Sequence, residues 1–230
     1  MGSVGRTLRR SLWEQVPRNH RDTTQGLRRR QVVTVTFLVI GALVLSFSLR
    51  IDPGNDWFYP ATLGLALVWT IGAFVSGPLH LGRTWPGETG RRPLLMPVVY
   101  AVALAGLFAV GGLLVRQIPA LDAQVRHVLD HADQGSVPLL LVITALNGVA
   151  EELFFRGALY AATPRYPVVV TTLAYGAVTL ATGNLMLAFA GLLLGILVGL
   201  ERRATGGILA PIITHVVWSS AMLVLLPALF

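Results

Sequence analysis

The sequence predicts an all-α membrane protein, a polytopic helix bundle of about seven transmembrane helices with a cytoplasmic N-terminus. Of its 230 residues, 54% are hydrophobic and 13% are charged, whereas soluble domains carry about 25% charged residues. The mean hydropathy is +0.67. The apolar residues also fall into runs close to the roughly 20 residues that a helix needs to cross a bilayer. Both observations favour a membrane bundle over a soluble domain.

Apolar runs and the polar stretches between them place the individual helices. The first three runs predict helices at about residues 31–49, 57–79 and 94–115. A polar stretch at 116–135 has the composition of a surface loop or a short interfacial helix. Four further apolar runs complete the seven helices, at about residues 136–162, 166–182, 185–201 and 208–228. We therefore divide the chain into a basic cytoplasmic arm (1–30), three transmembrane helices with an external polar loop (31–135), and a four-helix core (136–230).

Arginine accounts for all 18 basic residues and sets the expected orientation. Eight arginines precede the first apolar run: Arg6, Arg9, Arg10, Arg18, Arg21, Arg28, Arg29 and Arg30. Later segments on the same side contain Arg83, Arg91, Arg92, Arg165, Arg202 and Arg203, and the opposite side contains only Arg50, Arg116 and Arg126. This bias follows the positive-inside rule, and a basic arm beside a membrane helix contacts anionic lipid. We expect a lipid bilayer as partner and no nucleic acid, in a multi-pass plasma membrane protein. The composition indicates a bacterial source.

Two adjacent acids lie inside the apolar run at 136–162. Ionisable groups at membrane depth cost roughly 2.5–3.5 kcal/mol each on insertion scales, and they usually mark functional sites. Glu152 and Arg156 are four residues apart, so they share a helix face and can neutralise one another. Glu151 points about 100° away from Glu152, on the face that Asn147 occupies one turn earlier. We interpret Glu151 as an available proton acceptor or donor. An ion pair that only joins two helices is the alternative.

Hydroxyl groups and one histidine complete the polar residues at membrane depth. Thr172, Tyr175, Thr179 and Thr182 form one stripe on a helix, where such hydroxyls often only bond to neighbouring helices or to their own backbone. His215 and Ser219 lie one turn apart near the C-terminus. A lone buried histidine is more often structural than catalytic, but this one shares the membrane interior with two glutamates. Glycines at 191, 195 and 199 predict close helix packing and nothing more.

Two of these elements resemble motifs of a known family. The segment EELFFRG at 151–157 matches an E-E-x-x-x-R motif, and His215 matches a histidine that is followed four residues later by asparagine, here Ser219. Over about residues 138–226 the chain resembles the CAAX protease and bacteriocin-processing (CPBP) family, which includes type II CAAX prenyl endopeptidases and abortive-infection-like membrane proteins. The family's second motif, F-x-x-x-H, is altered: Tyr175 stands at its first position and Thr179 at its histidine.

The resemblance implies an intramembrane endopeptidase that hydrolyses a peptide or membrane-protein substrate with activated water. Glu151 would then be the general base and His215 an oxyanion or water ligand, with Glu152 and Arg156 as a supporting pair. Tyr175, Thr179, Ser219 and Asn147 would hold supporting positions. Some members are described as zinc proteases, but only Glu151, Glu152 and His215 are candidate ligands here. We expect no metal and no other cofactor.

Two alternatives follow from the same residues. Because threonine cannot act as a base, the chain could be a catalytically impaired relative that serves as a membrane regulator, scaffold or immunity factor. A small transporter that uses the buried acids as a proton relay is the second alternative. We place the endopeptidase first.

Overall fold

The computed structural model describes residues 5, 8–16, 22–82, 94–133 and 136–230. Within these ranges every regular element is a helix and no strand is present. Several arginines of the orientation argument lie outside the described residues, namely Arg6, Arg18, Arg21, Arg83, Arg91 and Arg92. The fold agrees with the predicted all-α bundle.

The first three membrane helices are α2 (Thr24–Ser48), α3 (Phe58–Ser76) and α4 (Leu95–Val115). Helix α2 begins before the predicted residue 31, because Thr23 caps it by accepting a hydrogen bond from the Gly26 backbone N–H. Such a cap satisfies one of the backbone donors left free in the first turn. The last three arginines of the predicted arm therefore lie within the helix.

The polar stretch forms an amphipathic helix, α5 (Pro119–Asp133), so of the two alternatives, loop or short helix, the structure has the helix. Its position is fixed by Gln124, which meets the start of α9 (Leu185–Thr205). The Gln124 side-chain oxygen accepts hydrogen bonds from the Leu185 and Met186 N–H groups at 2.7 and 3.2 Å. Its backbone oxygen accepts from the Asn184 side chain at 2.7 Å. These bonds hold α5 across the end of the bundle.

The second half of the chain supplies the remaining helices. Helix α6 (Val137–Glu152) continues through a π-helical segment, η2 (Leu153–Leu159), into α7 (Tyr160–Ala162). Then follow α8 (Pro167–Leu180), α9 and α10 (Leu209–Leu225). Among the described residues five helices are long and apolar enough to span a membrane: α2, α3, α4, the continuous helix 137–162 and α9. With the shorter apolar helices α8 and α10, the seven predicted helices are present. The chain is a multi-pass membrane bundle.

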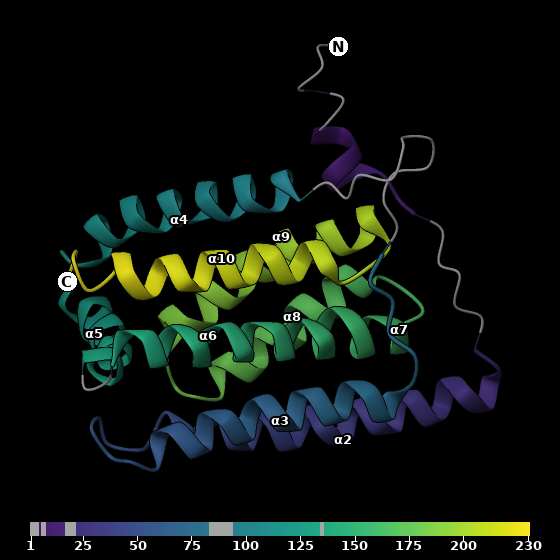
Figure 1. Ribbon diagram of the computed structural model, residues 1–230, viewed down its shortest axis with the longest axis horizontal. Coiled ribbons are helices and arrows are strands. Elements are labelled where there is room, and N and C mark those ends of the chain that lie inside the picture. Colours follow the sequence, from purple (N-terminus) through teal and green to yellow (C-terminus); the bar gives the residue numbers. More distant parts are fainter. Residues whose placement is uncertain (1–4, 6–7, 17–21, 83–93, 134–135) are drawn as a thin grey trace.

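The helices form layers around α6 (Figure 1). Helices α2 and α3 pair on one side, α6 and α8 lie in the middle, and α9, α10 and α4 lie on the other side. Helix α5 and the C-terminus lie at one end of the bundle, which we call the α5 end; α7 and the N-terminal turn η1 (Arg9–Trp13) lie at the other, the α7 end. The N-terminal segment is anchored to α9, since Arg203 Nη2 donates to the Leu12 carbonyl at 3.2 Å and Val16 N–H donates to the Arg203 carbonyl at 3.2 Å. Helix α6 is therefore enclosed from several sides.

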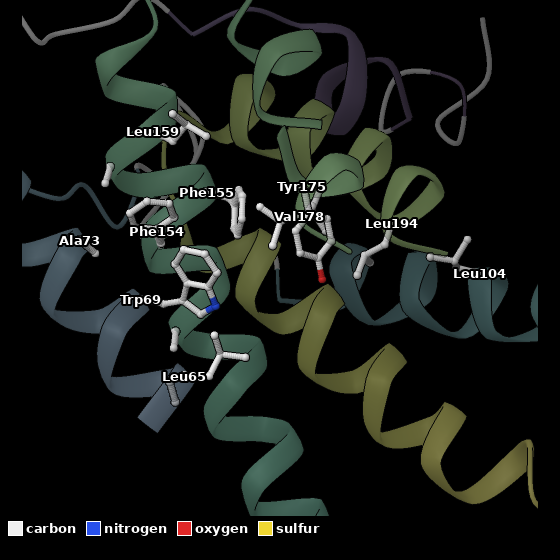
Figure 2. Close-up of a cluster of buried hydrophobic side chains, with 14 residues drawn as sticks. Leu65, Trp69, Ala73, Leu104, Phe154, Phe155, Leu159, Tyr175, Val178 and Leu194 are labelled. Carbon is white, nitrogen blue, oxygen red and sulfur yellow. The ribbon is translucent and has the colours of Figure 1, made fainter. Parts of the chain in front are cut away.

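An aromatic cluster packs against the acidic motif (Figure 2). The Trp69 ring of α3 lies 4.7 Å from the ring of Phe154 and 5.2 Å from the ring of Phe155, both in η2. Phe155 in turn contacts the Tyr175 ring of α8 at 4.9 Å. Both phenylalanines are fully buried. Because close packing rather than water exclusion holds helices together in lipid, this cluster fixes the position of η2.

The glycine stripe on α9 allows α8 to approach closely. A methyl group at Gly191 would lie 3.1 Å from Thr179, and one at Gly195 would lie 3.2 Å from Thr172. A methyl group at Gly199 would lie 3.0 Å from Val168. The predicted packing role is confirmed, and it brings Tyr175 and Arg156 together.

Candidate functional site

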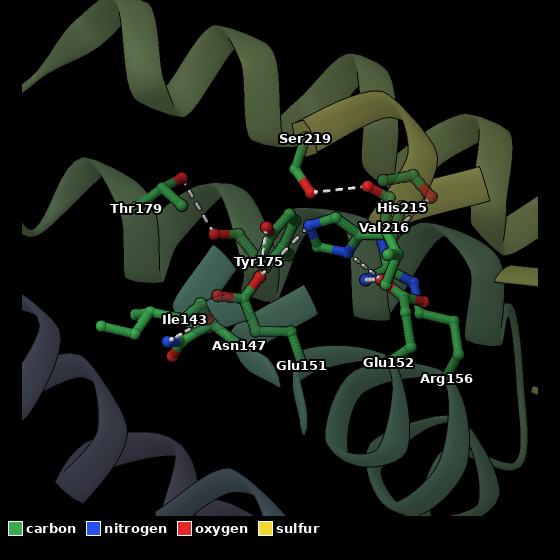
Figure 3. A network of polar contacts seen from close by, with 11 residues as sticks. Ile143, Asn147, Glu151, Glu152, Arg156, Tyr175, Thr179, His215, Val216 and Ser219 are labelled. Carbon is green, nitrogen blue, oxygen red and sulfur yellow. Dashed lines mark hydrogen bonds and ion pairs between the residues drawn. The ribbon is translucent and has the colours of Figure 1, made fainter. Parts of the chain in front are cut away.

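The predicted polar residues converge from three parts of the fold (Figure 3). Glu151 and Glu152 end α6, Arg156 lies in η2, Tyr175 lies on α8 and His215 lies on α10. Segments far apart in sequence thus bring two acids, an arginine, a tyrosine and a histidine into one cluster. The cluster divides into two parts with different environments.

Glu152 is the centre of the fully enclosed part. Its Oε1 atom accepts a hydrogen bond from Arg156 Nη1 at 3.0 Å and lies 2.8 Å from His215 Nδ1. The side chains of Glu152 and Arg156 are both 0% exposed. The predicted Glu152–Arg156 pair is confirmed. The contact with His215 was not predicted, since sequence spacing gives no information on how α6 and α10 meet.

Arg156 is held by contacts from two further elements, α9 and α8. Its Nη2 atom donates to the Gly195 carbonyl of α9 at 3.3 Å, and its guanidinium lies 5.0 Å from the centroid of the Tyr175 ring. A cation over an aromatic face is attracted to it, more so where water is excluded. A side chain at Gly195 would lie 3.2 Å from Nη2, so glycine is what gives Arg156 its place there. From the sequence, Gly195 was predicted to be a packing residue only.

The motif lies at a break in regular helix geometry. Residues 153–159 are π-helical, and such segments frequently occur at functional sites. Arg202 of α9 supports this segment: its Nε donates to the Arg156 carbonyl at 2.7 Å and its guanidinium lies 4.7 Å from the Tyr160 ring centroid. The sequence places Arg202 in a segment on the cytoplasmic side, and its burial, with 4% of the residue exposed, was not predicted. The available signal was the pair Glu201-Arg202 at the end of an apolar helix.

Glu151 belongs to the second, more accessible part. Its Oε2 atom accepts a hydrogen bond from the Tyr175 hydroxyl at 2.5 Å and lies 3.8 Å from His215 Nε2. The Glu151 side chain is 15% exposed. A separation of 3.8 Å is too long for a direct hydrogen bond, but two atoms this far apart can share one water oxygen as a hydrogen-bond partner. Arg156 forms its salt bridge with Glu152 and not with Glu151, in line with the predicted separation of the two faces, and Tyr175 is the hydrogen-bond partner of Glu151.

Three other predicted residues bond to their own helices. Thr179 Oγ1 donates to the Tyr175 and Gly176 carbonyls, both at 3.0 Å. Ser219 Oγ donates to the Val216 carbonyl at 3.3 Å, and Asn147 Nδ2 donates to the Ile143 carbonyl at 3.0 Å. Thr179 is thus engaged with its own backbone, and the side chain of α8 that bonds Glu151 is Tyr175.

The donor set does not suit a zinc ion. Glu152 Oε1 already has two partners, of which His215 Nδ1 is one. Its other oxygen, Oε2, has no hydrogen-bond partner among the described residues, but it is fully enclosed. Only Glu151 and His215 Nε2 then face the open part of the cluster, whereas hydrolytic zinc sites use three protein ligands. Among the described residues, no three histidine, aspartate or glutamate side chains lie close enough together to hold a metal ion.

One comparison with known proteins gives a match. Residues 133–221 match the family described as type II CAAX prenyl endopeptidase Rce1-like. The matched segment runs from the end of α5 into α10 and contains every side chain of the polar cluster. No curated protein and no solved structure matches the chain.

Proposed function

Because this chain belongs to the CPBP family through residues 133–221, we propose that it is an intramembrane endopeptidase with Glu151 as its general base. The single observation that carries the proposal is the setting of the Glu151 carboxyl. It is fixed by the Tyr175 hydroxyl, partly exposed, and opposite His215 Nε2. A base for hydrolysis needs such a position, within reach of one water molecule and away from a neutralising cation.

The proposed reaction is hydrolysis of one peptide bond. Glu151 accepts a proton from water, and the resulting hydroxide attacks the carbonyl carbon to form a tetrahedral intermediate. The proton then passes to the leaving nitrogen as the C–N bond breaks, so an acid and an amine are the products. General-base catalysis of this kind contributes about 10²–10⁴-fold in rate. The step uses water and the peptide alone.

Glu152 and Arg156 support this chemistry by orienting His215. With Nδ1 of His215 directed at Glu152 Oε1, Nε2 is the ring nitrogen left to face the water or the developing oxyanion. A base oriented in turn by a third group is the general arrangement of hydrolytic sites. Arg156 balances the charge of Glu152 at 3.0 Å, which allows a carboxylate to remain at this depth.

The setting of the reaction is also part of the proposal. We infer a multi-pass protein of a bacterial plasma membrane, with its N-terminus in the cytoplasm, since arginine is concentrated in the segments assigned to that side. The proposed substrate is a peptide or a membrane protein, and the proposed biological role is in abortive infection. The poor fit of the donor set to zinc supports a reaction without a metal cofactor. Nothing in the polar cluster favours nucleic acid as a partner.

The test compares the full chain with its Glu151→Gln variant in liposomes. Both proteins are incubated with a library of hydrophobic peptides, and the products are identified by mass spectrometry. We expect the substitution, which keeps the shape of the side chain, to lower cleavage about 10²–10⁴-fold with the protein still folded by gel filtration. Addition of a chelator should leave cleavage by the unsubstituted chain unchanged. Equal cleavage by both proteins would refute the proposal.

The second candidate is a catalytically impaired relative that acts as a membrane regulator, scaffold or immunity factor. The observation in its favour is Thr179, whose hydroxyl is used by its own backbone and which cannot exchange a proton as histidine does. Under this alternative, neither protein cleaves any peptide, and a cellular phenotype of the chain is unaffected by Glu151→Gln. Cleavage that arises only in the Thr179→His/Ser219→Asn double variant would also support it.

A further inference from the structure

A cavity of about 470 Å³ lies between α4, α9 and α10 and is covered by α5. This volume is within the roughly 300–1,000 Å³ of ligand pockets. Helices α4 and α9 each pack on α10 but make little contact with one another. The cavity therefore faces the lipid between them, where Leu107 and Phe189 on its wall are 58% and 51% exposed.

The cavity approaches the polar cluster without containing it. Its wall includes Trp218 and Ser219 of α10 and Thr144 of α6. Ser219 lies one helical turn beyond His215, and Thr144 lies about two turns before Glu151. The acids and Arg156 are not part of the wall. The cavity is thus a separate space that ends beside the candidate site.

The chemistry of the wall favours hydrocarbon over peptide. The wall is almost wholly apolar, and three of its few polar side chains are engaged, whereas the Trp218 Nε1–H has no hydrogen-bond partner among the described residues. Gln124 and Asn184 join α5 to α9, and Ser219 bonds to its own helix. A peptide in a membrane needs a partner for every backbone N–H and C=O group, and this wall offers few. A hydrocarbon chain needs none.

Two arginines lie beside the α5 end of the cavity. Arg116 Nη1 donates to the Leu229 carbonyl at 3.2 Å, and the Arg126 guanidinium lies 5.9 Å from the ring of Phe230, a wall residue. Both arginines are exposed. Asp122 engages the Nε atom of Arg126 at 2.8 Å. A guanidinium group binds phosphate oxygens through charge and directed hydrogen bonds on either side of a membrane, so charge and shape agree on one ligand.

We propose that this cavity binds one acyl chain of an anionic phospholipid. The phosphate of the lipid lies at Arg116 and Arg126, and the acyl chain extends along α10 toward Trp218. This lipid site is independent of the proposed peptidase reaction and can be tested on protein of either activity. Because the lipid site ends beside Ser219, the end of the acyl chain lies one helical turn from His215.

Trp218 serves as the internal probe for this lipid. The full chain is reconstituted in phosphatidylcholine bilayers that contain brominated phosphatidylglycerol, or brominated phosphatidylcholine at the same fraction. Bromine quenches tryptophan fluorescence on contact, and the part due to Trp218 is the difference from the Trp218→Phe variant. We expect brominated phosphatidylglycerol to bind beside Trp218 more tightly than brominated phosphatidylcholine, by about fivefold for each arginine that its phosphate contacts. The Arg116→Gln/Arg126→Gln double variant should lose this preference.

Two glycines of α4 supply a matched pair of variants. A side chain at Gly111, a wall residue, or at Gly106, which is not, meets no atom within 4 Å at its Cβ position. Gly111→Phe should therefore fill the cavity and abolish the quenching of Trp218, whereas Gly106→Phe should preserve it. Equal quenching by the two brominated lipids, or quenching that survives Gly111→Phe, would overturn the proposal. If Gly111→Phe instead abolished the crosslinking of a peptide to the protein and left the quenching by lipid unchanged, the cavity would be assigned to a peptide.

Discussion

Glu151 and Glu152 are adjacent in the sequence, yet their side chains belong to two regions that differ in almost every physical respect. Glu152, Arg156 and His215, which we call the buried triad, form a fully enclosed network with a carboxylate oxygen shared by two donors. Glu151 and Tyr175, the open pair, have one short hydrogen bond between them and some exposure. One step along α6, which turns the side chain by about 100°, separates the two environments.

Under the proposed function, the difference explains how one membrane helix carries both a structural acid and a reactive one. An unpaired charge in lipid is costly, so Glu152 is balanced by Arg156 and further satisfied by His215. Glu151 is spared such a partner and retains a carboxyl group that can exchange a proton. The buried triad then positions the histidine ring that faces Glu151. Stability and chemistry are assigned to neighbouring residues rather than shared by one.

The largest expected effect comes from breaking the buried triad. Arg156→Met removes the cation beside Glu152 and leaves an uncompensated carboxylate with 0% exposure. Removal of one partner of a buried ion pair destabilises by about 3–5 kcal/mol. We therefore expect a loss of that size in the free energy of unfolding, measured by denaturant titration in detergent micelles.

The double variant Glu152→Gln/Arg156→Met is the control for this experiment. With both charges gone, no isolated charge remains, and replacement of a whole buried pair is often close to neutral. Most of the lost stability should return. If the single variant is as stable as the unsubstituted chain, the triad does not hold the fold and the distinction between the two regions fails.

A smaller effect is expected when the open pair is broken. Tyr175→Phe removes only the hydroxyl that donates to Glu151 at 2.5 Å and keeps the ring against Arg156 and Phe155. A hydrogen bond to a charged group contributes about 1.5–3 kcal/mol. If Glu151 is the base, kcat/KM should fall about tenfold to a hundredfold, as each 1.4 kcal/mol is a factor of ten.

The pH profile of cleavage separates a positioning role from general damage. Loss of the Tyr175 hydroxyl removes a bond to the carboxylate form of Glu151, so the acidic limb of the profile should move. A lower rate at every pH with an unchanged profile would show that Tyr175 contributes packing only. Tyr166→Phe, at a residue that is 78% exposed, should leave both rate and profile unchanged.

Much of the bundle follows from the sequence, because apolar runs determine where a chain can cross lipid. The positions of α3, α4, α9 and α10 agree with the runs, and only the ends differ. The start of α2 was misplaced since helix propensity and a Thr23 cap extend the helix beyond the apolar residues. The polar stretch at 116–135 left loop and helix open, and the structure selects the helix.

Within the site, local geometry was predictable and contacts between helices were not. The Glu152–Arg156 pair and the separate face of Glu151 follow from 3.6 residues per turn. The contacts of Glu152 with His215, of Glu151 with Tyr175 and of Arg156 with Gly195 depend on how α6, α8, α9 and α10 pack. No spacing along one helix contains that information. The burial of Arg202 was not predicted for the same reason, as it depends on the meeting of α9 with η2.

The smallest effect is expected at Thr179, which shares α8 with Tyr175 and lies one turn further along. Its hydroxyl donates only to the Tyr175 and Gly176 carbonyls, which are also acceptors within the regular helix. Thr179→Val keeps the branched shape and removes the hydroxyl, so the free energy of unfolding should change by no more than about 1 kcal/mol, the net contribution of one hydrogen bond. Cleavage should be unchanged as well. A large loss of activity would place Thr179 in contact with the reacting groups, and the open pair would then have to include it. If instead Thr179→Val cleaves at the unchanged rate and Tyr175→Phe cleaves slowly, the contribution of α8 to catalysis comes from Tyr175 alone.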